Sequence, residues 1–408
     1  MFKKKNIFLV VSLLYILYTV FPIIPDVTGI EVWLVNLSTF VILLALYPRA
    51  FANPVMYWFM AYAAILAVYV IVGKPLTIGI GSVQDSKKVI IEYAFMLPSF
   101  SIFSILYYLK DYKLYKFIAG GGLVFVLLSF LYLVPMVWVN NEIMRDTFNL
   151  KAEYGIDTPG VPEYTLMHAY ILPIPALLYG IKVLEGRKKW LLFAVFVIFL
   201  YIILYSYVTT SIIITLGTII FALLYDTNNK PKSFLFIFLT GFVVYMLHSA
   251  GVFIQLFDFL LRFFDGTAVE PKIEGFKYIY LGGDIESSGG HITGRMSYHD
   301  MSWLAFSENF LIGGTSPVGG HSQIIDRLGG MGIIAFIPFV MIIISLIKMT
   351  LRIIRDKEQL IFYYLGLFSV FMLLYQKGLF GQEGWLFLMV LMPGLIITFR
   401  DIAKTGRM

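Results

Sequence analysis

Hydrophobic and polar positions alternate along this chain in long blocks, not at the short spacing of soluble helices or strands. A helix needs about 20 apolar residues to cross the roughly 30 Å of hydrocarbon in a membrane. Apolar runs near that length predict an all-α polytopic membrane protein with about twelve transmembrane helices. They lie at 6–23, 30–47, 55–72, 89–109, 117–139, 165–184, 190–207, 209–225, 233–251, 328–347, 360–376 and 380–399, with a turn expected near Thr209–Ser211.

Two polar stretches interrupt this pattern, at 140–164 and at 252–327. The second is far longer than the roughly 2–8 residues that usually join neighbouring helices. We therefore divide the chain into residues 1–251 with nine spans, a polar segment at 252–327 that carries the candidate active site, and residues 328–408 with three spans and the C-terminus.

Lys and Arg residues indicate how the spans are oriented, because they accumulate in short cytoplasmic loops. With the N-terminus inside, 20 of the 31 basic residues fall on the cytoplasmic side. This predicts cytoplasmic termini and places both polar stretches on the extracytoplasmic face of the membrane.

Composition supports a membrane protein, since 59% of residues are hydrophobic and only 14% are charged, against about 25% in soluble domains. The net charge of +6 follows the loop bias, so we expect membrane lipids and not nucleic acid as partners. The absence of cysteine excludes disulfides and Cys-ligated metals. The N-terminus resembles a signal peptide, but no small-residue cleavage site follows, so we interpret it as a retained first helix.

The polar segment 252–327 contains recognisable local patterns. Residues 252–264 form an expected interfacial helix with a polar stripe of Gln255, Asp258 and Arg262. A loop is expected at 265–294, then a helix over 295–309 in which Arg295 and His299 share a face. A Gly-rich loop at 313–320 should expose His321, and Ser322 should cap the next helix.

A helix N-terminus attracts anions, so His321 and Ser322 mark a candidate phosphate site. Asp326 could face the same site, hold the other nitrogen of the His321 imidazole, or simply complement the helix dipole. Four aromatic residues are candidates for sugar stacking or for interfacial anchoring, namely Tyr278, Tyr280, Tyr298 and Trp303. The isolated His168 and His248 are interpreted as structural.

Several motifs resemble those of the O-antigen polymerase and ligase superfamily of bacterial membrane proteins. The resemblance is carried by Thr293-Gly294-Arg295, by Trp303-Leu304, by the stretch from Glu308 to Gly314, and by Gly-Gly-His321-Ser322 with Asp326, Leu328 and Gly332. His-Ser at this point favours the polymerase branch, because ligases more often have His-Asn there.

The resemblance implies a GT-C-like glycosyltransferase architecture and a metal-independent, inverting transfer without a cofactor. Donor and acceptor would be undecaprenyl-diphosphate-linked oligosaccharides, and a chain-length regulator is an implied protein partner. His321 would match the family's base and Arg295 its diphosphate-binding cation, with Asp326 completing the catalytic set. His299, Ser322, Trp303, Arg327 and Arg145 are the further expected substrate contacts.

One position departs from the family pattern, since no Arg follows the turn at Thr209–Ser211. Arg327, Arg145 or Lys377 could replace it, or the site could rely on Arg295 and the helix end alone. Three alternatives stay open: a ligase with another acceptor, a transporter of the lipid-linked sugar, and a non-catalytic membrane component. A transporter would need charged residues inside its spans, and the spans contain few.

Overall fold

The computed structural model is almost entirely helical. It describes residues 2–74, 76–77, 83–84, 96–140, 143, 161, 164–206, 208–224, 246, 249, 251–267, 269–282, 290–320, 322–354, 356–376 and 381–405. One small departure from the all-α prediction appears among these residues. Strands β1 (Leu76–Thr77) and β2 (Val83–Gln84) pair antiparallel, with Leu76 opposite Gln84.

The N-terminal half supplies helices α1 (Phe2–Val20), α2 (Ile23–Thr28), α3 (Val32–Leu46), α4 (Pro54–Ile71), α6 (Leu97–Leu109), α7 (Tyr112–Val139), α9 (Tyr164–Ile171), α10 (Ile174–Val183), α11 (Gly186–Tyr205) and α12 (Thr209–Leu224), with a 3₁₀ turn η1 at Pro48–Phe51. The C-terminal half supplies α14 (Val252–Phe263), α15 (Glu270–Tyr280), α16 (Gly290–Glu308), α17 (Gln323–Ile353), α18 (Lys357–Gln376), α19 (Gln382–Leu386) and α20 (Met392–Thr405), with a π-helical segment η3 at Phe387–Leu391 between the last two.

Within the described part of the chain, seven segments are helical, long and apolar enough to cross a membrane. They coincide with seven of the predicted spans, and the C-terminal one runs from Gln382 to Thr405. Three shorter apolar helices, α3, α6 and α12, lie in three more predicted spans, and α1 lies in the first. The predicted span at 233–251 falls mostly outside the described residues. The structure therefore confirms several helices that could cross a membrane.

Some predicted boundaries need correction. The predicted loop at 265–294 contains α15, whose alternating charges and aromatic residues hid its helical pattern. The predicted span 165–184 is divided into α9 and α10, because Pro173 lacks the N–H that would continue the helix. The span predicted to start at 328 belongs to a helix that begins at Gln323. The predicted turn near Thr209 is confirmed by the break between α11 and α12.

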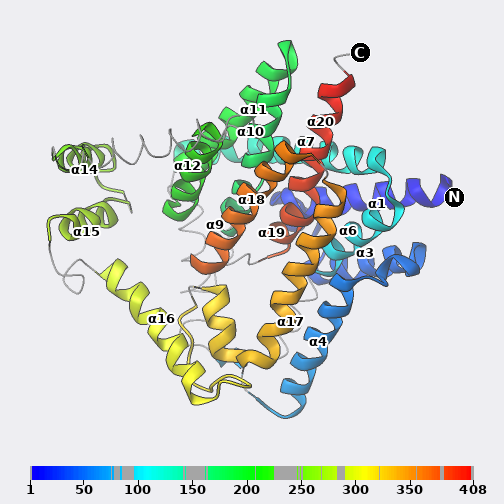
Figure 1. The fold of residues 1–408 in the computed structure, drawn as a ribbon, viewed down its shortest axis with the longest axis horizontal. Helices are drawn as coiled ribbons and strands as arrows, with labels where there is room; N and C mark the ends of the chain where they lie inside the picture. Colours follow the sequence, from blue (N-terminus) through cyan, green and yellow to red (C-terminus); the bar gives the residue numbers. More distant parts are fainter. Residues whose placement is uncertain are drawn as a thin grey trace.

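The core lies near the middle of the bundle, where α7 and α10 both pack against α20 (Figure 1). Phe130 packs edge-on against Tyr170 and Phe199, with ring centroids 4.6 Å apart in each pair. The segments Leu166–Val183 and Gln382–Thr405 are the most buried of the candidate spans. Helices α14 and α15 lie to one side of this bundle, at the left of Figure 1.

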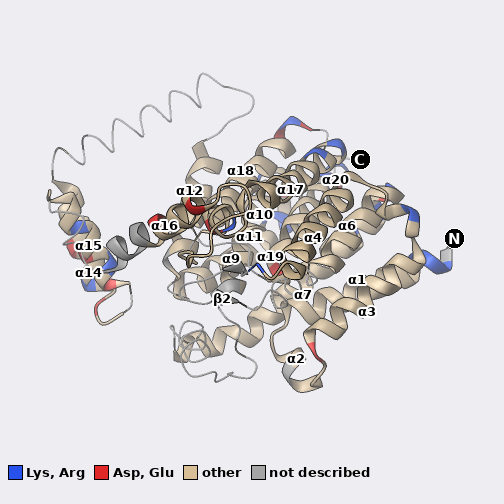
Figure 2. Ribbon diagram, turned by 90° about the horizontal axis from the view of Figure 1, so that it is seen from below, with Lys and Arg blue, Asp and Glu red and all other residues tan. Residues whose placement is uncertain are grey.

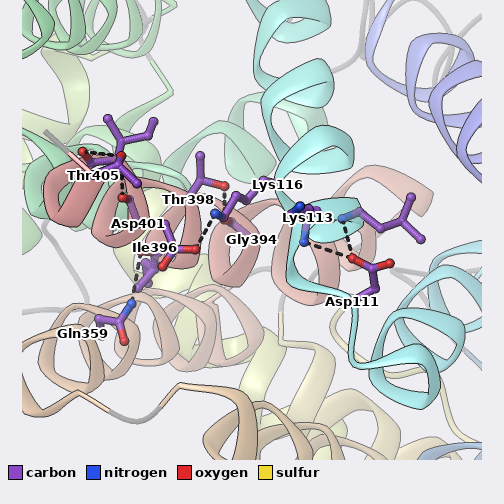
Figure 3. A network of polar contacts seen from close by, with 11 residues as sticks. Asp111, Lys113, Lys116, Gln359, Gly394, Ile396, Thr398, Asp401 and Thr405 are labelled. Atoms are coloured by element: carbon purple, nitrogen blue, oxygen red, sulfur yellow. Dashed lines mark hydrogen bonds and ion pairs between the residues drawn. The ribbon is translucent and has the colours of Figure 1, made fainter. Parts of the chain in front are cut away.

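Ion pairs gather at one end of the bundle, which we call the terminal end because both chain termini lie on that side (Figure 2). Lys5 contacts Asp111 at 2.6 Å, and Lys116 pairs with Asp401 of α20. Gln359 there donates a 3.3 Å hydrogen bond to the Ile396 carbonyl (Figure 3). The terminal end thus joins connections that were all predicted to lie on one side of the membrane.

The opposite end, which we call the loop end, is formed by the segment after α4 and by the loop of residues 309–322 between α16 and α17 (lower edge of Figure 1). Most of the candidate site residues belong to this end.

Candidate functional site

Asp326 lies at the junction of α16, the 309–322 loop and α17. Its Oδ1 accepts a 2.6 Å hydrogen bond from the Ser302 hydroxyl of α16, and its Oδ2 accepts a 2.8 Å bond from the Ser322 N–H. The Ser302 oxygen also accepts a 2.9 Å bond from the Gly319 N–H. Asp326 and Ser302 are buried, so these bonds hold the three segments together away from solvent.

Ser322 caps α17 as predicted, because its Oγ accepts a 3.3 Å bond from the Ile325 N–H. Together with the Asp326 bond to the Ser322 N–H, this forms a reciprocal arrangement close to a capping box. Two donors near the helix start are therefore used internally, and a carboxylate already complements the dipole. The helix start by itself therefore offers fewer free donors to a phosphate than the sequence suggested.

Glycines allow the loop and α17 to contact the backbone of α16. A Cβ at Gly319 would lie 2.1 Å from the Tyr298 carbonyl oxygen, and one at Gly329 would lie 2.4 Å from that of Ser302. Real Cβ atoms do not approach backbone so closely, so neither position accepts a larger residue without a shift. Part of the Gly-rich signal is therefore explained by close packing.

The first part of α17 is separated from the rest by a break at Gly332, where φ is 68°. Such a break leaves backbone groups on both sides without their intrahelical partners. Tyr69 donates to the Met331 carbonyl at 2.9 Å, and Lys74 donates to the Gly330 carbonyl at 2.8 Å. On the other side, the Ile333 N–H donates to the Phe310 carbonyl at 3.0 Å. The break is thus stabilised by α4 and by the loop.

Lys74 is buried and also donates to the Gly314 carbonyl at 3.3 Å. Burial lowers the pKa of Lys74 to about 8, and the Glu308 carboxylate opposes this shift. Hydrogen bonds from the Ser316 hydroxyl and from the Thr315 and Ser316 N–H groups lower the pKa of Glu308. The loop end therefore contains a buried cation and an exposed anion joined through the 313–316 backbone.

Two of the predicted site residues, His321 and Arg145, lie outside the described residues, as does Lys377. Arg295 lies on the backbone of α16, in an i, i+4, i+7 series with His299 and Ser302, but its side chain is outside the described part. The residues on both sides of position 321 are described, and Ser322 is bonded to Asp326. Helix α16, which carries Arg295, is therefore held through Ser302 against the described residues Gly319 and Ser322.

His299 is half-buried, and its ring centroid is 5.7 Å from that of Tyr375 on α18. It also lies close enough to act electrostatically on Asp326.

Trp303 is 48% exposed, and its ring contacts only Phe306 among the described aromatic residues. Its exposure is compatible with both interpretations offered for it, sugar stacking and interfacial anchoring.

Arg327 lies in the packing between α4 and α17. It is only 5% exposed, and its guanidinium carbon lies 4.1 Å from the centroid of the Phe339 ring. Its Nη1 donates a 3.4 Å bond to the Tyr62 hydroxyl. In this arrangement it stabilises the aromatic packing beneath the site through cation–π contacts.

The turn at Thr209–Ser211 has a structural role here. The Ser211 hydroxyl lies 2.9 Å from Nδ1 of His168, and both side chains are buried. This contact agrees with the structural interpretation of His168. His248 lies outside the described residues.

Sequence reasoning missed Ser302, Lys74 and Glu383. Ser302 lies seven residues after Arg295, so helical periodicity could have found it. Lys74 was counted only as a loop charge. Glu383 lies in α19, inside a predicted span, and acts electrostatically on the buried Tyr15 and Tyr170. The described residues contain no cluster of three His, Asp or Glu side chains that could hold a metal ion.

Comparison of the sequence with protein-family models finds no match, and comparison with curated proteins finds none either.

Proposed function

We propose that this chain is a polysaccharide polymerase that joins undecaprenyl-diphosphate-linked oligosaccharide repeat units on the outer face of the bacterial cytoplasmic membrane. Its product would be an O-antigen, an exopolysaccharide or a capsule. About twelve spans with both termini in the cytoplasm belong to the same proposal. The observation that carries it is the bond from Ser302 to Asp326, because it brings the two motif segments of the resemblance together.

In the proposed reaction, an acceptor sugar hydroxyl attacks the anomeric carbon of the donor repeat unit. The bond from that carbon to the diphosphate breaks, and undecaprenyl diphosphate leaves with the electron pair. His321 takes the hydroxyl proton, as an imidazole near neutral pH is suited to do. Arg295 binds the diphosphate and stabilises its charge. A single displacement of this kind inverts the anomeric configuration.

Asp326 has a positioning role in this proposal. Through Ser302 and Ser322 it fixes the distance between the helix of Arg295 and the chain on either side of position 321. A glycosyl transfer depends on such alignment, because misplacement of a catalytic group by about 1 Å can cost 100-fold in rate.

The proposal is tested by glycan length in cells that make the cognate repeat unit. Wild type should give a ladder of polymer, whereas His321→Ala and Arg295→Ala should stop at one unit while still inserting in the membrane. Arg262→Ala is the matched control, since it changes another arginine of the 252–327 segment on α14. Unaltered polymer in both site variants would refute the proposal. Transfer of single units to a different acceptor would identify a ligase.

A transporter of the lipid-linked sugar is the second candidate, and Glu383 is the observation that favours it. A carboxylate within a helix that could cross a membrane is costly and usually functional. Movement of single repeat units across the membrane that stops in Glu383→Gln, with no polymer formed by wild type, would support this alternative.

A further inference from the structure

A second polar site lies at the terminal end of the bundle, distant from the candidate glycan site. It is a cavity of about 330 Å³ between the end of α6, the start of α7 and the end of α17. Its lining combines cationic, aromatic and apolar side chains: Leu106, Tyr107, Lys110, Asp111, Tyr112, Tyr115, Arg352 and Ile353. No step of the proposed glycan transfer uses these residues.

The charge around this cavity is positive. Arg352 donates a 3.2 Å hydrogen bond to the Tyr107 hydroxyl, which holds it at the cavity wall. Among the described residues, neither Arg352 nor Lys110 forms an ion pair with a carboxylate. The one acidic residue in the lining, Asp111, is already bound by Lys5 at 2.6 Å and by the N–H groups of Lys113 and Leu114. Its charge is therefore balanced before any ligand binds.

Lys110 has an unusual backbone conformation. With φ at 51°, it is the one non-glycine residue at positive φ in the described part of the chain. It forms the left-handed end of α6, a position where glycine or asparagine is normally preferred. A lysine there costs backbone energy, and its side chain lines the cavity.

The surroundings indicate what kind of anion fits. Arginine and lysine together favour a phosphate group, which the guanidinium can bind through two hydrogen bonds. Leu106 and Ile353 give the cavity an apolar side, and helices that could cross a membrane end here. Tyrosines at such helix ends are typical of the membrane–water interface. A freely diffusing phosphate ion has no apolar group that could contact this side of the cavity.

We propose that this cavity binds the phosphate headgroup of an anionic phospholipid, with its acyl chains along the apolar side. Basic pockets between helices on the cytoplasmic face bind such lipids in membrane proteins. The terminal end is the face that the distribution of Lys and Arg predicts to be cytoplasmic. The proposal does not depend on the glycan reaction.

The test measures lipid binding to the purified full chain in detergent by native mass spectrometry. Phosphatidylglycerol should bind wild type more tightly than phosphatidylcholine. The double variant Lys110→Gln/Arg352→Gln should bind phosphatidylglycerol about tenfold more weakly. Both side chains are exposed at the cavity mouth, so the variant should keep its fold, which thermal unfolding checks. Lys348→Gln is the matched control, because this exposed lysine lies one turn before Arg352 and outside the cavity.

Equal binding of phosphatidylglycerol by wild type and the double variant would overturn the proposal. An equal loss in Lys348→Gln would do so as well, because it would show only a general effect of charge. A final arm adds inorganic phosphate as competitor. If phosphate displaces the lipid at equal concentration, the site binds a small anion and the lipid assignment is wrong.

Discussion

The two ends of the bundle are held together by different interactions. At the terminal end, charged pairs such as Lys182 with Glu358, 3.1 Å apart, are partly exposed and separately placed. At the loop end, buried hydrogen bonds converge on Asp326, and glycine contacts leave no space between α16 and α17. Exposed pairs contribute little and tolerate movement, whereas buried, connected bonds specify one geometry. The loop end is therefore the one that holds α16, the 309–322 loop and α17 in a fixed relative position.

The largest effect should come from adding a methyl group at the loop end. Gly329→Ala places a Cβ 2.4 Å from the Ser302 carbonyl oxygen, so α16 and α17 must separate, at a cost of about 3 kcal/mol. Gly217→Ala in α12 is the control, because a Cβ there meets nothing within 4 Å. The control should be neutral or slightly stabilising. Denaturant unfolding in detergent measures both, and equal stability of the two variants would contradict the close packing.

The next effect concerns the hydrogen bonds at the junction. Burial raises the pKa of Asp326, but both of its oxygens accept hydrogen bonds. Asp326→Asn keeps the shape and replaces one of these oxygens with an NH2 group that cannot accept, so we expect a loss of about 2 kcal/mol. Asp300→Asn on the exposed side of α16 should change stability by less than about 0.5 kcal/mol. In the glycan assay, Asp326→Asn should also shorten the polymer. Normal stability together with normal polymer length would show that Asp326 neither stabilises the junction nor positions the catalytic residues.

Lys74 gives the loop end a pH dependence. Its pKa is about 8 in the folded chain and 10.5 in the unfolded chain, so the unfolded chain binds more protons between these values. Stability should therefore rise with pH in this range. The free energy of unfolding of wild type, taken relative to that of Lys74→Met, should rise by about 1–2 kcal/mol between pH 7.5 and 9.5. A difference that stays constant with pH would show that burial does not penalise this ammonium group.

Glu308 gives a second pH dependence of the same sign, in the acid range. Hydrogen bonds from the loop lower its pKa, so its contribution is present above the ordinary value of 4.5 and disappears as pH falls through the lowered one. Glu308→Gln should therefore be less stable than wild type at neutral pH and equal to it in strong acid. Thermal unfolding at both pH values measures this, and a gap that persists in acid would contradict it.

The smallest effect should come from the terminal end. Lys182→Gln removes an ion pair whose side chains are 38% and 29% exposed, so stability should fall by less than about 1 kcal/mol. The difference in stability between wild type and Lys182→Gln should become smaller still in high salt, because salt screens the ion pair. A loss as large as that of Gly329→Ala would mean that the two ends are not held differently.

Much of the fold could be predicted from the sequence, because apolar runs of span length, the turn at Thr209 and the cap at Ser322 are local signals. The break of α17 at Gly332 could not, since it depends on donors from Tyr69 and Lys74 more than 250 residues away. The same applies to the site. Spacing suggested that Arg295 and His299 share a face, but the partner of Asp326 is set by tertiary packing of Ser302.

The polymerase proposal is tested most directly with purified protein in liposomes that contain the lipid-linked repeat unit and a metal chelator. The measurement is undecaprenyl diphosphate released per repeat unit incorporated, together with the length of the glycan. The account predicts a ladder of glycan lengths, with one undecaprenyl diphosphate released for each linkage formed. With His321→Ala it predicts neither the ladder nor released undecaprenyl diphosphate. Intact lipid-linked single units moved across the bilayer, with no diphosphate released, would contradict it.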